Sequence, residues 1–400
     1  MKVLIADKLS DKTVSALKTL GMEVAVNPDL TADSLPEAIK DSDVLVVRST
    51  KVTAKTITAA KNLSLIIRAG AGVNTIDLAG ANTRGIYVSN CPGKNTEAVA
   101  ELAIGLLIAA DRQIANATAD LRNGAWKKKE YGKARGLKGR TLGIVGFGAI
   151  GKAVAARALS LDMTVVAWSR SLTDETAEEL GVTRATDLQA LAKLSDAISV
   201  NVAYKPETHH LIDKTFFDAM KNGAILVNTS RGEVIDTAAL KEAIKAKKLR
   251  VGTDVFENEP AGGEAEFNDK ELAAIVTATP HIGASTDQAS EAIADEVVRI
   301  IRSFQQTGVA LNTVNIRARS SATQSLVIRH YNRVGVLAGI LGKLKGSGIN
   351  VEEMTNIIFD GSKAACCTLL LDAAPSGEVI SEMEKDENII ELALKPLSTE

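Results

Sequence analysis

The fold of this chain is decided by residues 141–152, which read TLGIVGFGAIGK. An apolar run typical of a buried strand, 141–145, comes directly before glycines in the spacing Gly-x-Gly-x-x-Gly, and a helical run follows them. Gly146 permits a tight turn, Gly148 lets backbone amides approach a pyrophosphate, and Gly151 lets helix and strand pack closely. The stretch therefore predicts a dinucleotide-binding unit. A tight strand-to-helix turn without a ligand is the alternative.

Strands and helices alternate on both sides of that unit until about residue 300. On its N-terminal side the pattern predicts a helix over 11–20 and strands over 3–6, 44–48, 65–68 and 86–89. Such alternation is typical of doubly wound parallel sheets. We therefore expect an α/β protein with two Rossmann-like domains, one made of residues 1–95 and 285–318 and the other of residues 96–284.

Two long helices are predicted where these domains join. The first covers 96–123 and contains the longest apolar stretch of the chain, 98–110. The second covers 285–305 and opens with Ser285-x-x-Gln288, the pattern of a capping box. We expect this second helix to return the chain to the first domain.

A third unit follows a polar segment over 317–324, which predicts a linker. The pattern after the linker predicts strand, helix, strand, strand, helix and strand over 325–330, 335–347, 351–359, 364–371, 376–385 and 389–397. This βαββαβ order is that of the ferredoxin-like fold. We expect a C-terminal domain of this type over residues 323–400.

Composition excludes several classes of protein. The chain has 400 residues, enough for two or three domains at about 150 residues each. Its 47 basic and 49 acidic residues give a net charge of −2, which fits neither a polybasic nucleic-acid binder nor a disordered acidic chain. The N-terminus lacks the apolar core of a signal peptide, and the stretch 98–110 is too short to span a membrane. Cys91, Cys366 and Cys367 offer no disulfide framework, which indicates a reducing compartment, so we expect a cytoplasmic protein. From the charge and the short apolar stretch we expect no nucleic-acid or membrane partner.

Three reactive side chains stand just past the predicted ends of strands, where ligands bind in open α/β sheets. They are Arg231, Glu259 and His281. A guanidinium can hold a substrate carboxylate, a histidine can take a hydroxyl proton, and a carboxylate beside that histidine favours its protonated form. Each alone would more often be a solvated loop residue, but their order beside a dinucleotide motif indicates a catalytic set.

The residues after the predicted strand 164–168 bear on cofactor choice. An acid that binds the ribose hydroxyls of NAD is expected there, but Ser169 and Arg170 follow instead. Serine and arginine can bind a 2′-phosphate, so NADP is possible beside NAD. His209 and His210 have no cysteine or HExxH partner nearby, and we therefore predict surface histidines and no metal site.

Basic residues are concentrated at two places. Arg48, Lys51 and Arg68 lie at strand ends of the first domain, and the second group is 127–129 with Arg135. They form either a solvated face or a pocket for a doubly charged phosphate group facing the cofactor cleft.

The motifs described above resemble those of a known family. Residues 1–318 are similar to the D-isomer-specific 2-hydroxyacid dehydrogenases through four ordered motifs, namely the glycine turn, 228–232 (NTSRG), 254–260 (DVFENEP) and 279–283 (TPHIG). Within that family, 47–53 (VRSTKVT), 68–73 (RAGAGV) and 90–96 (NCPGKNT) resemble the phosphoglycerate dehydrogenase branch. The tail resembles a regulatory ACT domain.

The resemblance implies oxidation of 3-phosphoglycerate with NAD, or NADP, in which His281 takes the proton, Glu259 stabilises the imidazolium and Arg231 holds the carboxylate. The implied cofactor contacts are Gly146, Gly148, Ala149, Ile150, Gly151, Ser169, Arg170, Thr229, Ser230, Asp254 and Gly283. The implied substrate contacts of the first domain are Arg48, Ser49, Lys51, Arg68, Gly70, Gly72 and Val73. An L-serine effector would bind His330, Asn332 and Asn350, and the chain would form a homo-oligomer.

Two departures from the family pattern leave alternatives open. Ser169 replaces the ribose-binding acid, and Val334 stands where ACT domains usually have proline. A glyoxylate or hydroxypyruvate reductase using NADPH shares the catalytic set and is one alternative. A non-catalytic protein that senses NAD is another, and a purely structural tail is the alternative to a serine-binding one.

Overall fold

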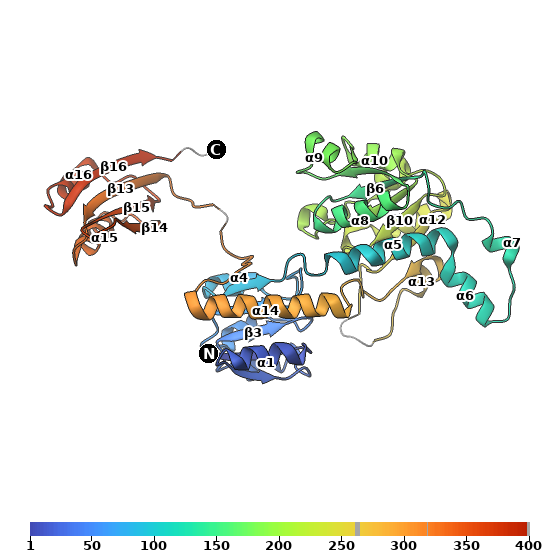
Figure 1. Cartoon of the computed structure of the whole chain (residues 1–400), viewed down its shortest axis with the longest axis horizontal. Helices are drawn as coiled ribbons and strands as arrows, with labels where there is room; N and C mark the ends of the chain where they lie inside the picture. The colour runs from blue at the N-terminus through green and yellow to red at the C-terminus, as the bar shows by residue number, and fades with distance from the viewer. Residues whose placement is uncertain (261–264, 318, 398–400) are drawn as a thin grey trace. The chain divides into compact units, whose positions relative to one another are not determined.

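The computed structural model describes residues 1–260, 265–317 and 319–397 (Figure 1). The expected domain boundary at residue 318 and the last residues of the third domain, 398–400, lie outside the described residues. The chain divides into two compact units, Met1–Asn315 and Ile316–Glu400. None of the described helices has both the length and the apolar character needed to cross a membrane.

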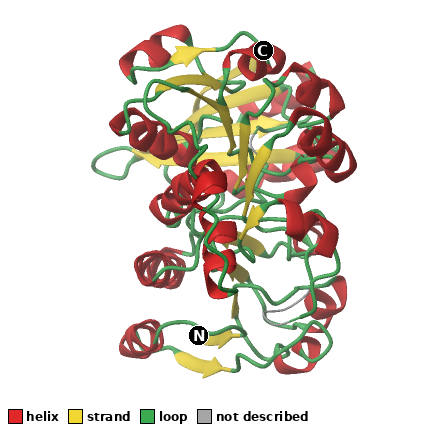
Figure 2. Ribbon diagram, turned by 90° about the vertical axis from the view of Figure 1, so that its right-hand side faces the viewer, coloured by secondary structure: helices red, strands yellow, loops and turns green. Residues whose placement is uncertain are grey.

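The first unit contains a parallel sheet in the order β2-β1-β3-β4-β5, with helices on either side of its strands (Figure 2). Its strands are β1 (Lys2–Ile5), β2 (Glu23–Val26), β3 (Val44–Val47), β4 (Leu65–Arg68) and β5 (Tyr87–Asn90). Its helices are α1 (Asp11–Thr19), α2 (Leu35–Ala38), α3 (Ala54–Ala59) and α4 (Leu78–Thr83). The pattern missed β2, because this edge strand is mostly exposed and has no buried run to mark it.

A second parallel sheet of the same unit has the order β12-β11-β10-β9-β6-β7-β8. Its strands are β6 (Thr141–Val145), β7 (Thr164–Trp168), β8 (Thr183–Arg184), β9 (Ala197–Val200), β10 (Ile225–Asn228), β11 (Arg250–Thr253) and β12 (Thr277–Ala278). Its helices are α8 (Ala149–Ser160), α9 (Asp174–Glu179), α10 (Leu188–Leu194), α11 (Lys214–Ala219), α12 (Thr237–Lys247) and α13 (Lys270–Ile275). Because β9 and β10 are buried along their whole length, they form the centre of the sheet beside β6.

The predicted helix over 96–123 is wrong as a single element. It consists of α5 (Thr96–Arg112) and α6 (Ile114–Arg122), and α7 (Lys128–Tyr131) follows. Gln113 between them has a left-handed backbone, with φ of 53°, and its N–H donates to the carbonyl of Ala109. A left-handed residue ends a helix, and glutamine gives no sign of it in the sequence because it is a good helix former.

The returning helix is α14 (Asp287–Thr307), which packs Ile293, Val297 and Ile301 into the core of the first sheet. The expected capping box at Ser285 is wrong. Thr286 is the N-cap, and its side chain accepts from the amide of Ala289. Alanine at that position has no side chain to return the bond, so the reciprocal pattern does not form.

The second unit has the predicted βαββαβ order. Its elements are β13 (Gln324–Tyr331), α15 (Val336–Gly346), β14 (Val351–Ile358), β15 (Ala364–Leu371), α16 (Gly377–Glu384) and β16 (Ile389–Pro396). The strands form an antiparallel sheet in the order β14-β15-β13-β16. Alternate residues of the central strands, such as Leu326, Ile328 and Leu369, face the helices and build the core.

Candidate active site

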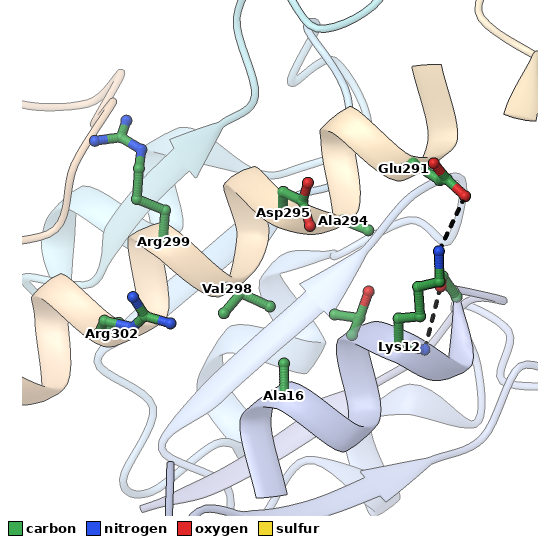
Figure 3. Close-up of a pocket in the computed structure, with 10 residues that line it drawn as sticks. Lys12, Ala16, Glu291, Ala294, Asp295, Val298, Arg299 and Arg302 are labelled. Atoms are coloured by element: carbon green, nitrogen blue, oxygen red, sulfur yellow. Dashed lines mark hydrogen bonds and ion pairs between the residues drawn. The ribbon is translucent and has the colours of Figure 1, made fainter. Parts of the chain in front are cut away.

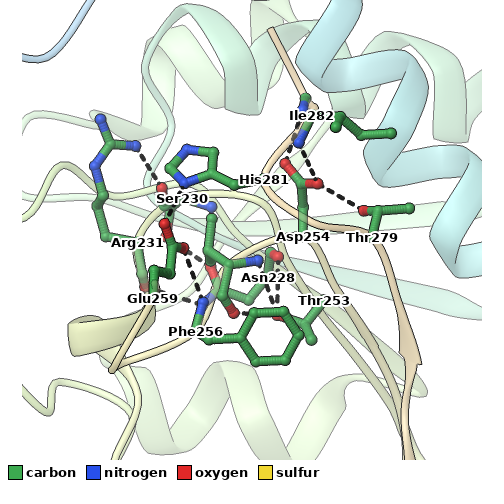
Figure 4. Close-up of polar contacts among 12 residues, drawn as sticks. Asn228, Ser230, Arg231, Thr253, Asp254, Phe256, Glu259, Thr279, His281 and Ile282 are labelled. Carbon is green, nitrogen blue, oxygen red and sulfur yellow. Dashed lines mark hydrogen bonds and ion pairs between the residues drawn. The ribbon is translucent and has the colours of Figure 1, made fainter. Parts of the chain in front are cut away.

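A histidine and a glutamate form a close pair beyond the ends of β11 and β12 (Figure 4). His281 Nδ1 lies 2.6 Å from Glu259 Oε2, and Glu259 Oε1 accepts from the amide of Phe256 at 3.0 Å. Burial alone would raise the pKa of Glu259, but the hydrogen bonds from His281 and Phe256 outweigh burial and lower it. The carboxylate is therefore ionised beside the imidazole. Because Nδ1 faces Glu259, Nε2 is the ring nitrogen that can meet a ligand.

Asp254 organises the loop that carries His281. It is 1% exposed, and its Oδ1 accepts from Thr279 Oγ1 at 2.6 Å and from the amide of Ile282 at 2.8 Å. Its Oδ2 accepts from the amide of Gly283 at 2.8 Å, and its carbonyl accepts from the amide of His281, whose φ is 53°. These bonds hold His281 in a left-handed conformation that a non-glycine residue rarely adopts. Both carboxylate oxygens of the expected cofactor contact Asp254 are thus engaged with its own loop.

Arg231 lies beside this pair, on the turn after β10 (Figure 4). Its Nη1 donates to the carbonyl of Ser230 at 2.6 Å, and its own carbonyl accepts from Asn228 Nδ2 at 3.0 Å. A side chain on Gly232 would collide with the backbone of Phe256. The turns that carry Arg231 and Glu259 are therefore in direct backbone contact, and Arg231 contributes to the lowered pKa of Glu259.

Two more arginines belong to the first sheet and its loops, Arg68 at the end of β4 and Arg48 just after β3, and Arg68 feels the charges of both Arg231 and Arg48. Burial, together with the charges of Arg231 and Arg48, lowers the pKa of Arg68 to about 10. Arg68 Nε donates to the carbonyl of Arg48 at 3.1 Å, and a Cβ on Gly72 would lie 2.6 Å from Arg231 Nη2. A group of arginines that repel one another is stabilised by an anion, so this cluster can hold a multiply charged acid.

The other expected substrate contacts of the first domain differ in how firmly they are held and in how exposed they are. The carboxylate of Asp7 accepts from the amide of Arg48 at 2.7 Å and from Ser49 Oγ at 2.6 Å, which fixes the loop after β3. A side chain on Gly70 would displace the guanidinium of Arg68. Val73 is half-buried against the core of the first sheet, and Lys51 is exposed.

The glycine turn has the geometry that its sequence predicts. Gly146 has φ of 93°, and a Cβ there would lie 2.7 Å from Val202 Cγ1. A Cβ on Gly151 would collide with the carbonyl oxygen of Gly146, whereas a Cβ on Gly148 would meet nothing within 4 Å. Gly148 is the N-cap of α8, so the open space lies at the positive end of that helix. Ala149 and Ile150 form its first turn.

Two buried polar atoms near the ends of β9 and β10 have no hydrogen-bond partner among the described residues. They are Asn201 Oδ1 and Thr229 Oγ1, and Ser230 stands beside them. Unpaired buried polar atoms and a glycine cradle open to a ligand both fit a bound dinucleotide. Ser169 is half-buried after β7, and Arg170 is exposed. The sequence reasoning missed Asn201, although a polar residue directly after a buried strand beside β6 was a usable signal.

The expected effector residues do not converge within one chain. His330 is 1% exposed, and its ring nitrogens face the carbonyl of Tyr331 at 2.8 Å and Asn356 Oδ1 at 3.4 Å. Asn332 donates to the carbonyl of Ser362. Asn350 donates to Glu352 at the start of β14, and His330 lies near the end of β13. Because β13 and β14 both pair antiparallel with β15, they run in the same direction, and the two residues lie at opposite ends of the sheet.

A pocket of about 380 Å³ lies between α1 and α14 (Figure 3). Its lining includes Lys12, Glu291 and Asp295 and contains none of the expected site residues. Of the second basic group, Lys127 is paired with Asp120 of α6 at 3.0 Å. The strand-end cluster, rather than this pocket or the α6 to α7 region, has the groups needed for chemistry.

The glycine turn at the N-terminus of α8 and the cluster beyond the strand ends define a dinucleotide-binding α/β protein of the oxidoreductase class. Residues 104–283 match the model of the D-isomer specific 2-hydroxyacid dehydrogenase NAD-binding domain. The chain is 43% identical over 304 residues to the hydroxypyruvate reductase of Thermotoga maritima, covering 75% of this chain and 96% of that one. The chain belongs to the D-isomer-specific 2-hydroxyacid dehydrogenase family.

Two dehydrogenases of D-2-hydroxy acids are also similar to this chain. The D-3-phosphoglycerate dehydrogenase of Methanocaldococcus jannaschii is 41% identical over 369 residues, which cover 90% of this chain. The chain spans 66% of the length of that relative. The holo form of Rhodotorula graminis D-mandelate dehydrogenase matches with a TM-score of 0.71 and 30% identity, over 78% of this chain and 97% of that one.

Proposed function

We propose that this chain is a D-3-phosphoglycerate dehydrogenase, which transfers hydride reversibly between 3-phosphoglycerate and a nicotinamide dinucleotide to give 3-phosphohydroxypyruvate, the first step of L-serine biosynthesis. The arginine cluster carries the proposal. A phosphorylated 2-hydroxy acid has a carboxylate and a doubly charged phosphate, and Arg48, Arg68 and Arg231 provide a matching positive charge. Glyoxylate and hydroxypyruvate, which lack a phosphate, do not require so many arginines.

The roles of the chain's residues follow from their chemistry. Arg231 holds the substrate carboxylate, which places C2 and its hydroxyl toward His281. His281 Nε2 accepts the hydroxyl proton during oxidation and returns it to the keto oxygen during reduction. Glu259, at 2.6 Å from Nδ1, stabilises the imidazolium that forms. Gly146, Gly148, Gly151 and Thr229 are the residues that would hold the dinucleotide, which supplies the hydride acceptor when it is bound.

A reductase of hydroxypyruvate or glyoxylate is the second candidate. It is favoured by Ser169 and Arg170 after β7, which suit NADPH, and by the hydroxypyruvate reductase among the relatives. A non-catalytic sensor would bind the dinucleotide at the same glycine turn without converting any substrate.

Steady-state rates separate these candidates. The purified chain is assayed with 3-phosphohydroxypyruvate, hydroxypyruvate and glyoxylate, each with NADH and with NADPH. We expect the highest kcat/KM with the phosphorylated acid and a selective loss of that preference in Arg68→Ala. A higher kcat/KM with glyoxylate or hydroxypyruvate would establish the reductase, and nucleotide binding without turnover would establish the sensor.

We also propose that the C-terminal unit is an ACT domain that binds L-serine in a homo-oligomer. Because His330 and Asn350 lie at opposite ends of the sheet of one chain, a shared effector site requires two copies. Calorimetric titration of L-serine into the wild type and into the double variant Asn332→Ala, Asn350→Ala tests it. Heat of L-serine binding and inhibition by L-serine that appear in the wild type but not in the double variant would support the site. If the wild type shows neither, the tail is structural. A cytoplasmic location is proposed on the free thiols of Cys91, Cys366 and Cys367.

A further inference from the structure

A second cluster of reactive side chains includes a residue of the turn that carries Glu259. It joins His209 and His210, which follow the short helix Pro206–Thr208, to Glu257 after β11. The two imidazole rings stack with centroids 3.9 Å apart, and His210 Nε2 lies 2.7 Å from Glu257 Oε1. One ligand atom from each residue lies within 4.8 Å of the others.

Against the sequence prediction of surface histidines and no metal site, we infer that His209, His210 and Glu257 form a binding site for a divalent transition-metal ion, with Zn²⁺ as the best match. Two imidazoles and one carboxylate form a set of protein ligands that binds zinc with one position left for water. At metal–ligand distances of about 2.0–2.2 Å, neighbouring ligand atoms of a tetrahedral site lie about 3.4 Å apart. To reach that spacing, the exposed His209 side chain must move closer to the other two ligands, and the His210–Glu257 pair must widen from 2.7 Å.

Two of the ligands are already oriented for this role. His210 has φ of 50°, and its amide donates to the carbonyl of Glu233 at 2.9 Å, so its ring is directed toward Glu257. Glu257 also accepts hydrogen bonds from Thr237, at the start of α12. Outer partners of this kind fix the orientation of metal ligands. The metal would replace the proton shared between His210 and Glu257.

The position of the cluster gives it a structural consequence. Glu257 precedes Glu259 by two residues, and the backbone of Phe256 and Glu257 packs directly on Gly232. A bound ion would therefore tie the loop after β9 to the turn that positions Glu259. We expect the ion to raise the Tm, because a ligand that binds only the folded state stabilises it.

Titration with metal alone tests the site in the full chain with any affinity tag removed. Zn²⁺ is titrated by calorimetry, and Co²⁺ is added as a spectroscopic probe whose visible bands report tetrahedral coordination. We expect one Zn²⁺ per chain and strong cobalt bands. His209→Ala and Glu257→Gln should each weaken binding by about tenfold or more and abolish the rise in Tm.

Glu207→Gln is the matched control, because it changes a carboxylate of the same loop that is not among the three ligands. It should bind Zn²⁺ like the wild type. Circular dichroism of the metal-free variants checks that they are folded, and the exposed His209 can be truncated without disturbing the core. No binding by the wild type, or unchanged cobalt bands in both ligand variants, would overturn the inference.

Discussion

Asp254→Asn should both destabilise the chain and slow its reaction. The carboxylate accepts from Thr279 Oγ1 at 2.6 Å and from the amides of Ile282 and Gly283 at 2.8 Å each. An asparagine keeps one oxygen and turns an amide group toward a donor. One charge-assisted hydrogen bond is lost and the others become neutral, which should lower the free energy of unfolding by about 4 kcal/mol. Since Ile282 and Gly283 directly follow His281, kcat/KM should fall by about a hundredfold.

Urea unfolding followed by circular dichroism gives the first quantity, and the rate of NADH oxidation with 3-phosphohydroxypyruvate gives the second. Asp213→Asn is the control, because Asp213 only caps α11 through the amide of Phe216 at 2.9 Å. Asparagine caps a helix as well as aspartate, so that variant should stay within about 0.5 kcal/mol of the wild type. If Asp254→Asn matched the wild type in both measurements, the loop-organising role of Asp254 would be refuted.

Three further changes have defined outcomes. Glu296 is 5% exposed on its side chain, and its bonds to Arg299, with those to Asn312 and Lys94, lower its pKa from 4.5 to about 2. Because the folded-state pKa is lowered, this stabilisation is complete above about pH 5 and is lost as pH falls toward 2, at about 3 kcal/mol in all. Urea unfolding against pH should therefore show a loss of stability between about pH 5 and 2 that is about 3 kcal/mol smaller in Glu296→Gln than in the wild type. Ser169→Asp should raise the ratio of kcat/KM for NADH over NADPH by about 10- to 100-fold, and an unchanged ratio would show that Ser169 does not lie at the ribose. Gly151→Ala should lower the free energy of unfolding by about 1–3 kcal/mol and weaken NADH binding in a fluorescence titration, whereas Gly148→Ala should unfold like the wild type.

The parts of the fold that the sequence predicted are those fixed by burial along a single element. β6, β9 and β10 are buried throughout, so an apolar run alone locates them. The glycine motif locates the turn because its requirements are local. A side chain on Gly146 or Gly151 would collide with neighbouring atoms, and the absence of one on Gly148 leaves open space. The sequence also predicted that Arg231, Glu259 and His281 lie close together, because each follows one of three neighbouring parallel strands whose carboxyl ends share one edge of the sheet.

Features that depend on contacts between distant segments were missed. The break at Gln113 and the mostly exposed edge strand β2 leave no periodic signal. Glu257 stands 47 residues from His210, so their pairing is invisible until β11 and the loop after β9 are placed side by side. Asp254 was expected to touch the cofactor, but the pairing of its carboxylate with the His281 loop depends on a three-dimensional fit that spacing cannot show.

The proton transfer assigned to His281 is tested most directly by the kcat of His281→Ala. The rate of 3-phosphohydroxypyruvate reduction is measured at saturating NADH, and the Kd of NADH is measured separately by fluorescence. We expect kcat to fall by about two to four orders of magnitude with the Kd unchanged, because a general acid contributes that much. A kcat within about tenfold of the wild type would contradict the assignment of His281 as the acid and base.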